Sequence, residues 1–352
     1  MSLFNKLDFV RNEISEIKDI KQKPKGGLST FSSRIRYAIS LGFKEKEIFI
    51  FGLLQWASIG IGYILWVQML DWIPESVWRS AARSDDISSA DIILFAWSFV
   101  CVGIAAFPVG IFTGCMGAAH FLHRRGEEST VATCLKLVLP QSWPLWLFHW
   151  IDGWITVSQI VDRLPRKNDT RSSAQIALGE AMYYAWKLGV SGVLPSIVTG
   201  NGLIASGKNS IKFVKNNFSE IKKLRAGYSI LCWMVGIGAY IGTIILFITF
   251  DVIPEGDEVY SNMYAIYLWA AVPILVAVGF VMLLLRPIYV LTLCDLYADY
   301  LEENNIKPPL PDKASLPVSV FVSFSILCLL VLTVFLFCNE IGVIDMLSSS
   351  NQ

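Results

Sequence analysis

The stretch Tyr228–Phe250, YSILCWMVGIGAYIGTIILFITF, decides the fold because it is long, apolar and free of charged residues. A helix needs about 20 apolar residues to cross the hydrocarbon layer of a membrane. The stretch follows the basic sequence KKLRAG and precedes the acidic sequence DVIPEGDE. Because Lys and Arg are enriched on the cytoplasmic side of membrane-spanning helices, this helix is predicted to begin inside and end outside.

The composition of the whole chain is that of a membrane protein. Of the 352 residues, 54% are hydrophobic and 16% are charged, whereas soluble domains carry about 25% charged residues. Lys plus Arg and Asp plus Glu both number 29, so net charge indicates no particular partner, and no nucleic acid is expected. The seven cysteines lack C-x-x-C spacing and lie mostly in apolar runs, so we expect them to be reduced.

The apolar runs predict an all-α fold, a polytopic transmembrane helix bundle. Five runs are long enough to span: 48–70, 92–119, 228–250, 263–285 and 316–338. Glycines in the first and third of these are expected to permit close helix packing.

Two weaker runs, 143–161 and 174–199, contain ionisable residues, each of which costs about 3 kcal/mol near the middle of a membrane helix. Both runs also have basic flanks. We therefore expect two interfacial or re-entrant helices beside the five spans. The alternative is that both cross as a pair, which leaves the orientation of the other spans unchanged.

The distribution of basic residues predicts the orientation. Residues 1–47 hold ten Lys and Arg, and the tail 339–352 holds none. The N-terminus is therefore predicted to be cytoplasmic and the C-terminus external, in the plasma (inner) membrane of a prokaryote.

The chain divides into three predicted parts. Residues 1–27 are expected to form an amphipathic cytoplasmic helix and a linker, 28–304 the transmembrane core, and 305–352 a linker, the last span and an external tail.

A repeated sequence suggests a duplication within the core. D-x-I-P-E occurs at Asp71–Glu75 and again at Asp251–Glu255, which favours two related units, 28–130 and 203–304. The alternative is that proline and acidic residues are simply common where spans leave the membrane.

The sequence GLIASGKNS, Gly202–Ser210, differs by one residue from the phosphate-binding pattern G-x-x-x-x-G-K-[ST]. Asn209 stands where a hydroxyl should hold Mg²⁺. The nearest acidic residue after an apolar run is Asp251, which is predicted to lie across the membrane from Lys208. We therefore expect neither a nucleotide nor another cofactor.

The segment 203–225 is instead predicted to be a basic amphipathic helix. Ile211, Val214, Phe218 and Ile221 fall on one helical face. The adjoining face carries a group of predicted membrane-surface lysines: Lys208, Lys212, Lys215, Lys222 and Lys223. Helices of this kind lie in the headgroup plane, so anionic phospholipid is an expected partner.

Other polar residues suggest weaker candidates. His149 and Asp152 lie at i and i+3 on a Trp-rich helix, where they form a possible polar site, either a proton-relay or substrate pair or a set of polar groups that reach the headgroups. His120 and His123 lie one turn apart, but no third ligand is evident, so no metal site is predicted. Arg286 ends an apolar run and is expected to extend to the inner membrane surface.

One arrangement resembles that of an uncharacterised family of polytopic prokaryotic inner-membrane proteins. Its members carry the pattern W-x(n)-hhPhhV-x-x-G-h-x-x-[AS]-x-[KR]-x-S, which matches here at Trp186, Pro195, Val198, Gly202, Lys208 and Ser210. The resemblance covers roughly 33–300, and TGNG at 199–202 departs from the acid or Glu-Gly of the family. It implies a polytopic membrane protein with interfacial helices and carries no activity or catalytic residues.

Together these features predict a non-enzymatic integral membrane protein: a scaffold, an assembly factor or an accessory subunit with a membrane-protein partner or a second copy. The predicted spans are nearly free of charge, whereas ion-coupled transporters carry ionisable residues inside the bundle. A transporter or permease for a lipid or small solute is the alternative. A membrane enzyme that uses His149 and Asp152 is the second alternative.

Overall fold

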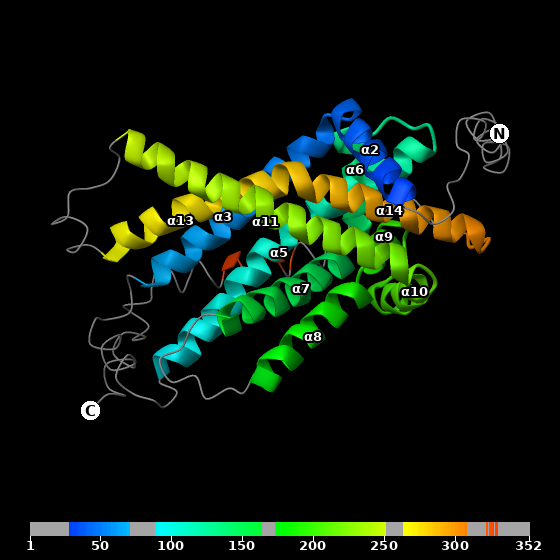
Figure 1. Cartoon of the computed structure of the whole chain (residues 1–352). Helices are drawn as coiled ribbons and strands as arrows, with labels where there is room; N and C mark the ends of the chain where they lie inside the picture. The colour runs from blue at the N-terminus through cyan, green and yellow to red at the C-terminus, as the bar shows by residue number, and fades with distance from the viewer. Residues whose placement is uncertain are drawn as a thin grey trace.

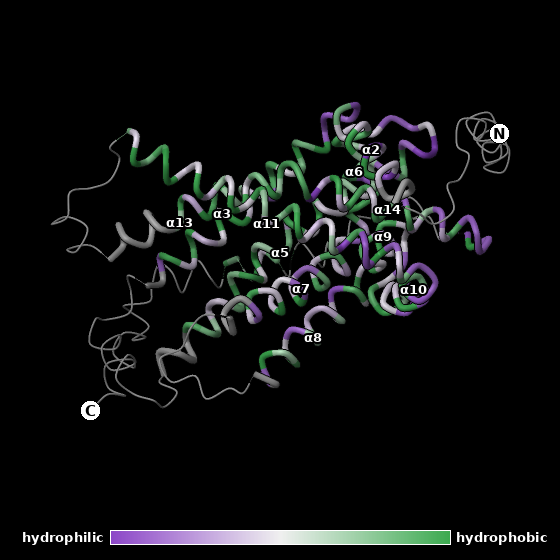
Figure 2. The backbone as a smooth tube through the Cα atoms, in the orientation of Figure 1, coloured by the Kyte–Doolittle hydropathy of each residue, from purple (hydrophilic) through white to green (hydrophobic). Residues whose placement is uncertain are grey.

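The computed structural model describes residues 28–70, 89–163, 173–250, 263–307 and a few positions between 322 and 329. Every regular element in these ranges is a helix, and most helices run along one common direction (Figure 1). Figure 2 shows hydrophobic residues along most of the bundle and hydrophilic residues gathered at the end where α2, α10 and α14 lie. We call this end the polar end. The all-helical prediction is thus confirmed for the described residues.

Within the described ranges, four helices are long and apolar enough to cross a membrane. They are α3 (Glu47–Leu70), α5 (Ser89–Arg124), α11 (Phe218–Thr249) and the continuous helix of α13 (Met263–Phe280), π-helix η2 (Val281–Leu285) and α14 (Arg286–Glu303). They match the first four predicted spans. The fifth, 316–338, lies almost wholly outside the described residues, as do the segment 1–27 and both D-x-I-P-E sequences.

The candidate spans pack as hairpins, α3 against α5 and α11 against α13. Gly52 on α3 approaches η2 closely, since a Cβ there would lie 3.0 Å from the carbonyl oxygen of Met282. By contrast, a Cβ at Gly236, Gly238 or Gly242 of α11 would meet nothing within 4 Å. Close packing is therefore found at Gly52 of α3, whereas Gly236, Gly238 and Gly242 of α11 face no part of the described chain.

Helix α7 (Ser142–Arg163) lies lengthwise along α5 in the antiparallel sense. The indole N–H of Trp146 donates to the carbonyl of Gly103 at 2.8 Å, and that of Trp150 donates to the carbonyl of Phe99 at 3.0 Å. One turn further, the ring of Trp154 lies 4.8 Å from that of Phe95. Later residues of α7 thus meet earlier residues of α5, so α7 runs away from the polar end.

The predicted run 174–199 is divided into two helices, α8 (Ser173–Gly189) and α9 (Val193–Val198). Ser210 of α10 (Leu203–Asn216) closes the turn between them. Its hydroxyl donates to the carbonyl of Gly189 at 2.6 Å and accepts from the N–H of Gly192 at 2.8 Å. Only glycine fits at position 192, because a Cβ there would lie 2.7 Å from the ring of Phe213.

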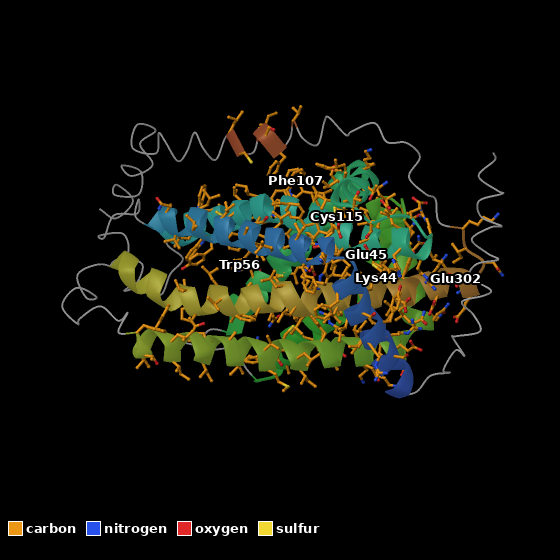
Figure 3. All side chains as sticks on the ribbon, turned by 90° about the horizontal axis from the view of Figure 1, so that it is seen from above. Lys44, Glu45, Trp56, Phe107, Cys115 and Glu302 are labelled. Atoms are coloured by element: carbon orange, nitrogen blue, oxygen red, sulfur yellow. The ribbon has the colours of Figure 1, made fainter. Side chains whose placement is uncertain are left out.

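The main core lies toward the polar end, where α2 (Leu28–Lys44), α6 (Val131–Val138) and α9 pack on α5 and α14. Figure 3 shows Cys115 of α5 among the crowded side chains between these helices. The largest fully buried side chains include those of Tyr297, Phe213 and Met116. Burying such a side chain contributes about 1.5–3 kcal/mol. The six cysteines in the described part of the chain are unpaired, as the sequence predicts.

Candidate functional site

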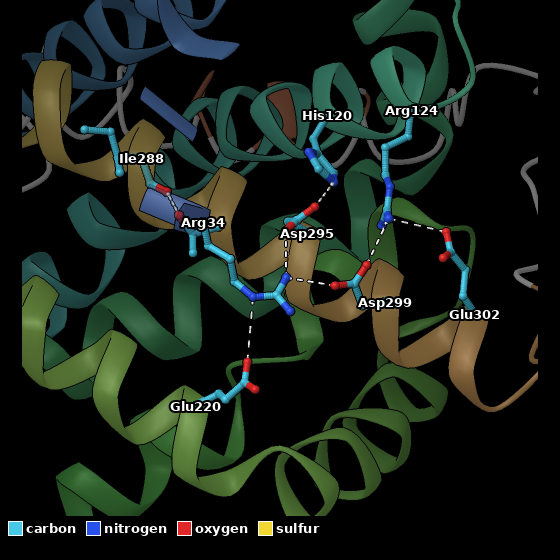
Figure 4. A network of polar contacts seen from close by, with 9 residues as sticks. Arg34, His120, Arg124, Glu220, Ile288, Asp295, Asp299 and Glu302 are labelled. Carbon is cyan, nitrogen blue, oxygen red and sulfur yellow. Dashed lines mark hydrogen bonds and ion pairs between the residues drawn. The ribbon is translucent and has the colours of Figure 1, made fainter. Parts of the chain in front are cut away.

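An ion-pair network joins α2, α5 and α14 at the polar end (Figure 4). Arg34 Nη1 donates to Asp295 Oδ2 at 2.7 Å and lies 2.9 Å from Asp299 Oδ2. The other oxygen of Asp299 accepts from Arg124 at 2.9 Å. The side chains of Arg34 and Asp295 are only 18% and 5% exposed. Two arginines and two aspartates thus hold three helices together inside the protein.

This network stabilises the charged form of Arg34. Burial opposes that charge, but the carboxylates of Asp299 and Asp295 outweigh the effect and raise the pKa of Arg34 above its usual value. Burial also raises the pKa of the neighbouring Tyr37 to about 12, and Asp295 adds to the shift. Both groups therefore stay protonated at neutral pH, as in a structural clamp rather than a proton-transfer site.

His120 and His123 turn to different partners. His120 is fully buried, with Nε2 3.9 Å from Asp295 Oδ1. His123 Nδ1 instead lies 3.1 Å from Glu45 Oε1, whose second oxygen accepts from Ser129 at 2.6 Å. Among the described residues, no group of three His, Cys, Asp or Glu side chains could hold a metal ion.

A second polar cluster forms where α7, α8, α11 and α14 meet. Asp152 of α7 pairs with Lys187 of α8, with Oδ1 2.6 Å from Nζ, and accepts from the indole N–H of Trp186 at 3.1 Å. Arg225 of α11 donates to the carbonyl of Lys187 at 3.0 Å and to the hydroxyl of Tyr289 on α14 at 3.4 Å. These contacts connect four helices through side chains from distant parts of the sequence.

Arg286, which the sequence predicts to extend to the inner membrane surface, completes this cluster. Its Nε is buried and has no hydrogen-bond acceptor among the described residues. It lies close enough to His149, Lys187 and Tyr228 to act on them electrostatically. The π-helix η2 ends at the residue before Arg286. A π-turn offsets the register of an α-helix, which the sequence pattern does not reveal. We call Lys187, Arg225 and Arg286 the cationic cluster.

The predicted pair of His149 and Asp152 lies beside the cationic cluster but does not act as a directly bonded pair. His149 is buried, and its Nδ1 donates to the carbonyl of Leu145 at 2.9 Å. Asp152 is committed to Lys187 and Trp186. The cations beside this pair could not be predicted from the sequence, because they come from other helices.

The predicted surface lysines of α10 and α11 are exposed, and the residues of the predicted apolar face are divided between these two helices. The buried residues of α10 are Ser206, Ser210 and Phe213. Ile204 is 79% and Ile211 66% exposed. The predicted helix 203–225 is not continuous, because α10 ends at Asn216 and α11 begins at Phe218. Of the predicted apolar face, Ile211 and Phe218 are exposed and Ile221 is buried.

The exposed face of α10 mixes apolar and basic residues. Ile204, Lys208, Ile211 and Lys215 are spaced by three and four residues, and Lys212 lies beside them. Lys222 and Lys223 are exposed on the first turns of α11. Figure 1 shows α10 nearly end-on, so it lies across the direction of the long helices.

The sequence Gly202–Ser210 forms the start of α10 and follows another helix, α9, rather than a strand. Gly202 is the N-cap of α10. The hydroxyl of Ser210, which comes one residue after the position expected for a Mg²⁺ ligand, is bonded to Gly189 and Gly192. Gly202 and Ser210 thus have a structural role in joining α8, α9 and α10.

No protein-family model, curated protein or solved structure matches this chain. Three features of the structure bear on the function of this protein: the exposed α10 face, the open side of α11 and the cationic cluster.

Proposed function

We propose that this protein is a non-enzymatic integral membrane protein, a scaffold, assembly or accessory subunit whose polar end contacts the anionic inner leaflet of a prokaryotic plasma membrane. The exposed face of α10 is the observation that carries this proposal. It combines Ile204 and Ile211, which are strongly exposed, with Lys208, Lys212 and Lys215. Apolar side chains flanked by lysines suit the boundary between acyl chains and anionic headgroups.

The direction of α10 supports the same placement. A helix that lies across the spans is parallel to the membrane plane when the spans cross the membrane (Figure 1). In this arrangement the N-terminus is cytoplasmic, and α7 enters the membrane beside α5, with which it packs lengthwise. The pair α7 and α8 is then either re-entrant or, in the alternative that the sequence leaves open, crosses the membrane as a pair.

Neutralising the lysines of α10 is expected to weaken the preference of the protein for anionic lipid. A lysine near an anionic surface contributes about 1 kcal/mol, so Lys208→Gln, Lys212→Gln and Lys215→Gln together should reduce the preference by up to about 100-fold. The measurement is electron paramagnetic resonance of spin-labelled phosphatidylglycerol and phosphatidylcholine around the reconstituted full chain. Lys136→Gln, an exposed lysine on α6, is the matched control, and an equal loss in the control would contradict the proposal.

The open side of α11 supports the scaffold role. Most of α11 is exposed, and Gly236, Gly238 and Gly242 meet nothing within 4 Å. Figure 3 shows the side chains of α11 projecting outward along much of its length. Small residues let the backbones of membrane helices approach closely. We propose a transmembrane helix of another membrane protein as the occupant of this side.

Gly238→Leu is expected to abolish the binding of a stoichiometric partner and to leave the stability of the chain itself unchanged. Open space surrounds Gly238 within the described chain, whereas a leucine would prevent close approach of a second helix. Native mass spectrometry of complexes extracted in membrane discs compares the variant with wild type. A homodimer that the substitution dissociates would assign this side to a second copy, and an unchanged complex would reject the role of α11.

A further inference from the structure

The cationic cluster carries more positive than negative charge. Lys187, Arg225 and Arg286 contribute the cations, and the carboxylate of Asp152 is bound to Lys187 at 2.6 Å. Within the part of the chain that the structure describes, no carboxylate lies within ion-pair distance of Arg225 or Arg286. Both arginines are partly buried, and a partly buried charge is stabilised by a counter-charge, so an anion from outside the described chain would suit them.

The guanidinium of Arg225 is held in a position from which it can bind such an anion. One nitrogen of its guanidinium, Nη1, is held by the Lys187 carbonyl and the Tyr289 hydroxyl. The Tyr289 ring is in turn stacked on that of Tyr228, with centroids 4.4 Å apart. Since a guanidinium carries five N–H donors, most donors of Arg225 remain for a ligand. A pre-positioned guanidinium binds a phosphate through two parallel hydrogen bonds.

Both arginines lie at the boundary between the apolar and polar parts of their helices. Arg225 comes shortly before the apolar stretch Tyr228–Phe250, and Arg286 follows the apolar run that ends at Leu285. In a membrane this boundary coincides with the level of the lipid phosphates. Basic pockets between transmembrane helices at the cytoplasmic side bind anionic headgroups in this way.

We propose that Arg225 and Arg286 bind one phosphate group, supplied by the headgroup of an anionic phospholipid, between α8, α11 and α14. The buried Nε of Arg286 and the free donors of Arg225 supply its hydrogen bonds, and the Tyr228–Tyr289 stack borders the site. This inference depends on the proposed membrane placement. It differs from the contact at α10, because it involves a single retained ligand rather than a general preference for anionic lipid.

Native mass spectrometry of the full chain tests the site. Protein in neutral detergent is titrated with phosphatidylglycerol or phosphatidylcholine, and the retained lipid is counted. Wild type should retain one phosphatidylglycerol in preference to phosphatidylcholine. Arg225→Gln and Arg286→Gln should each weaken its retention at least tenfold, whereas Lys223→Gln, an exposed neighbour on α11, should leave it unchanged. Arg286→Lys should fall between, because it keeps the charge and loses the planar donors.

Further measurements separate the possible outcomes. Competition by inorganic phosphate at equal potency would assign the site to a free anion, whereas resistance to it would assign the site to a lipid. Thermal stabilisation of wild type by phosphatidylglycerol, absent with phosphatidylcholine, supports the site even if a variant does not fold. Retention by Arg286→Gln equal to wild type, or no lipid preference in wild type, overturns the proposal. The triple glutamine variant of α10 should retain the single lipid, so failure of the surface contact is distinguishable from failure of this site.

Discussion

Arg34→Met is expected to lower the free energy of unfolding by about 3–5 kcal/mol, the cost of leaving one partner of a buried ion pair without the other. The substitution removes the hydrogen bond from Nη1 to Asp295 Oδ2 at 2.7 Å. Asp295, whose side chain is only 5% exposed, then lacks this partner. Asp299 keeps its bond to Arg124 at 2.9 Å. The loss should therefore come mainly from the orphaned charge of Asp295.

A second substitution tests this cause directly. In the double variant Arg34→Met with Asp295→Leu, the unpaired charge is gone, and most of the lost stability should return. Glu302→Gln removes an outer partner of Arg124 that is 57% exposed and 3.4 Å away, and it should change stability by less than about 1 kcal/mol. Reversible unfolding in mixed micelles, followed by circular dichroism, measures all three variants. A double variant as unstable as Arg34→Met would show that the network is not the cause.

The candidate spans could be predicted from the sequence because they require only length and hydropathy. Tyr228–Phe250 is apolar throughout, and α11 contains nearly all of it. The ends of these helices are harder to predict, because α5 and the α13–η2–α14 helix continue beyond their apolar runs into the polar end. Hydropathy marks where a helix leaves the hydrocarbon layer, and it does not mark where the helix ends.

The polar clusters could not be predicted from the sequence because their members are far apart in the chain. Arg34 and Asp295 are separated by 261 positions, and no local pattern indicates their contact. The neighbours of Arg286 could not be predicted because a π-turn of only five residues, Val281–Leu285, precedes it and offsets the helical register. The division of the predicted helix 203–225 could not be seen because the break at Asn217 interrupts a stripe that appears continuous in the sequence. In each case tertiary contacts or backbone register decided the outcome.

Gly110→Val is expected to separate α7 from α5 and to destabilise the protein by about 1–3 kcal/mol, the usual cost of overpacking a close contact. A Cβ at Gly110 would lie 3.0 Å from the carbonyl oxygen of Leu145 and 3.2 Å from His149 Nδ1. Backbone atoms of α7 cannot turn aside as a flexible side chain can, so the whole helix must move. Such a shift strains the bond from Trp146 to the carbonyl of Gly103.

Gly60→Val on α3 provides the matched control, because a Cβ at Gly60 would meet nothing within 4 Å. The two variants add the same side chain to a candidate span and differ only in whether the glycine faces another helix. Thermal unfolding in detergent should show a clear loss for Gly110→Val and almost none for Gly60→Val. Equal stability of the two variants would mean that α7 does not pack on α5 along its length, and the cationic cluster would then lose the helix that supplies its carboxylate.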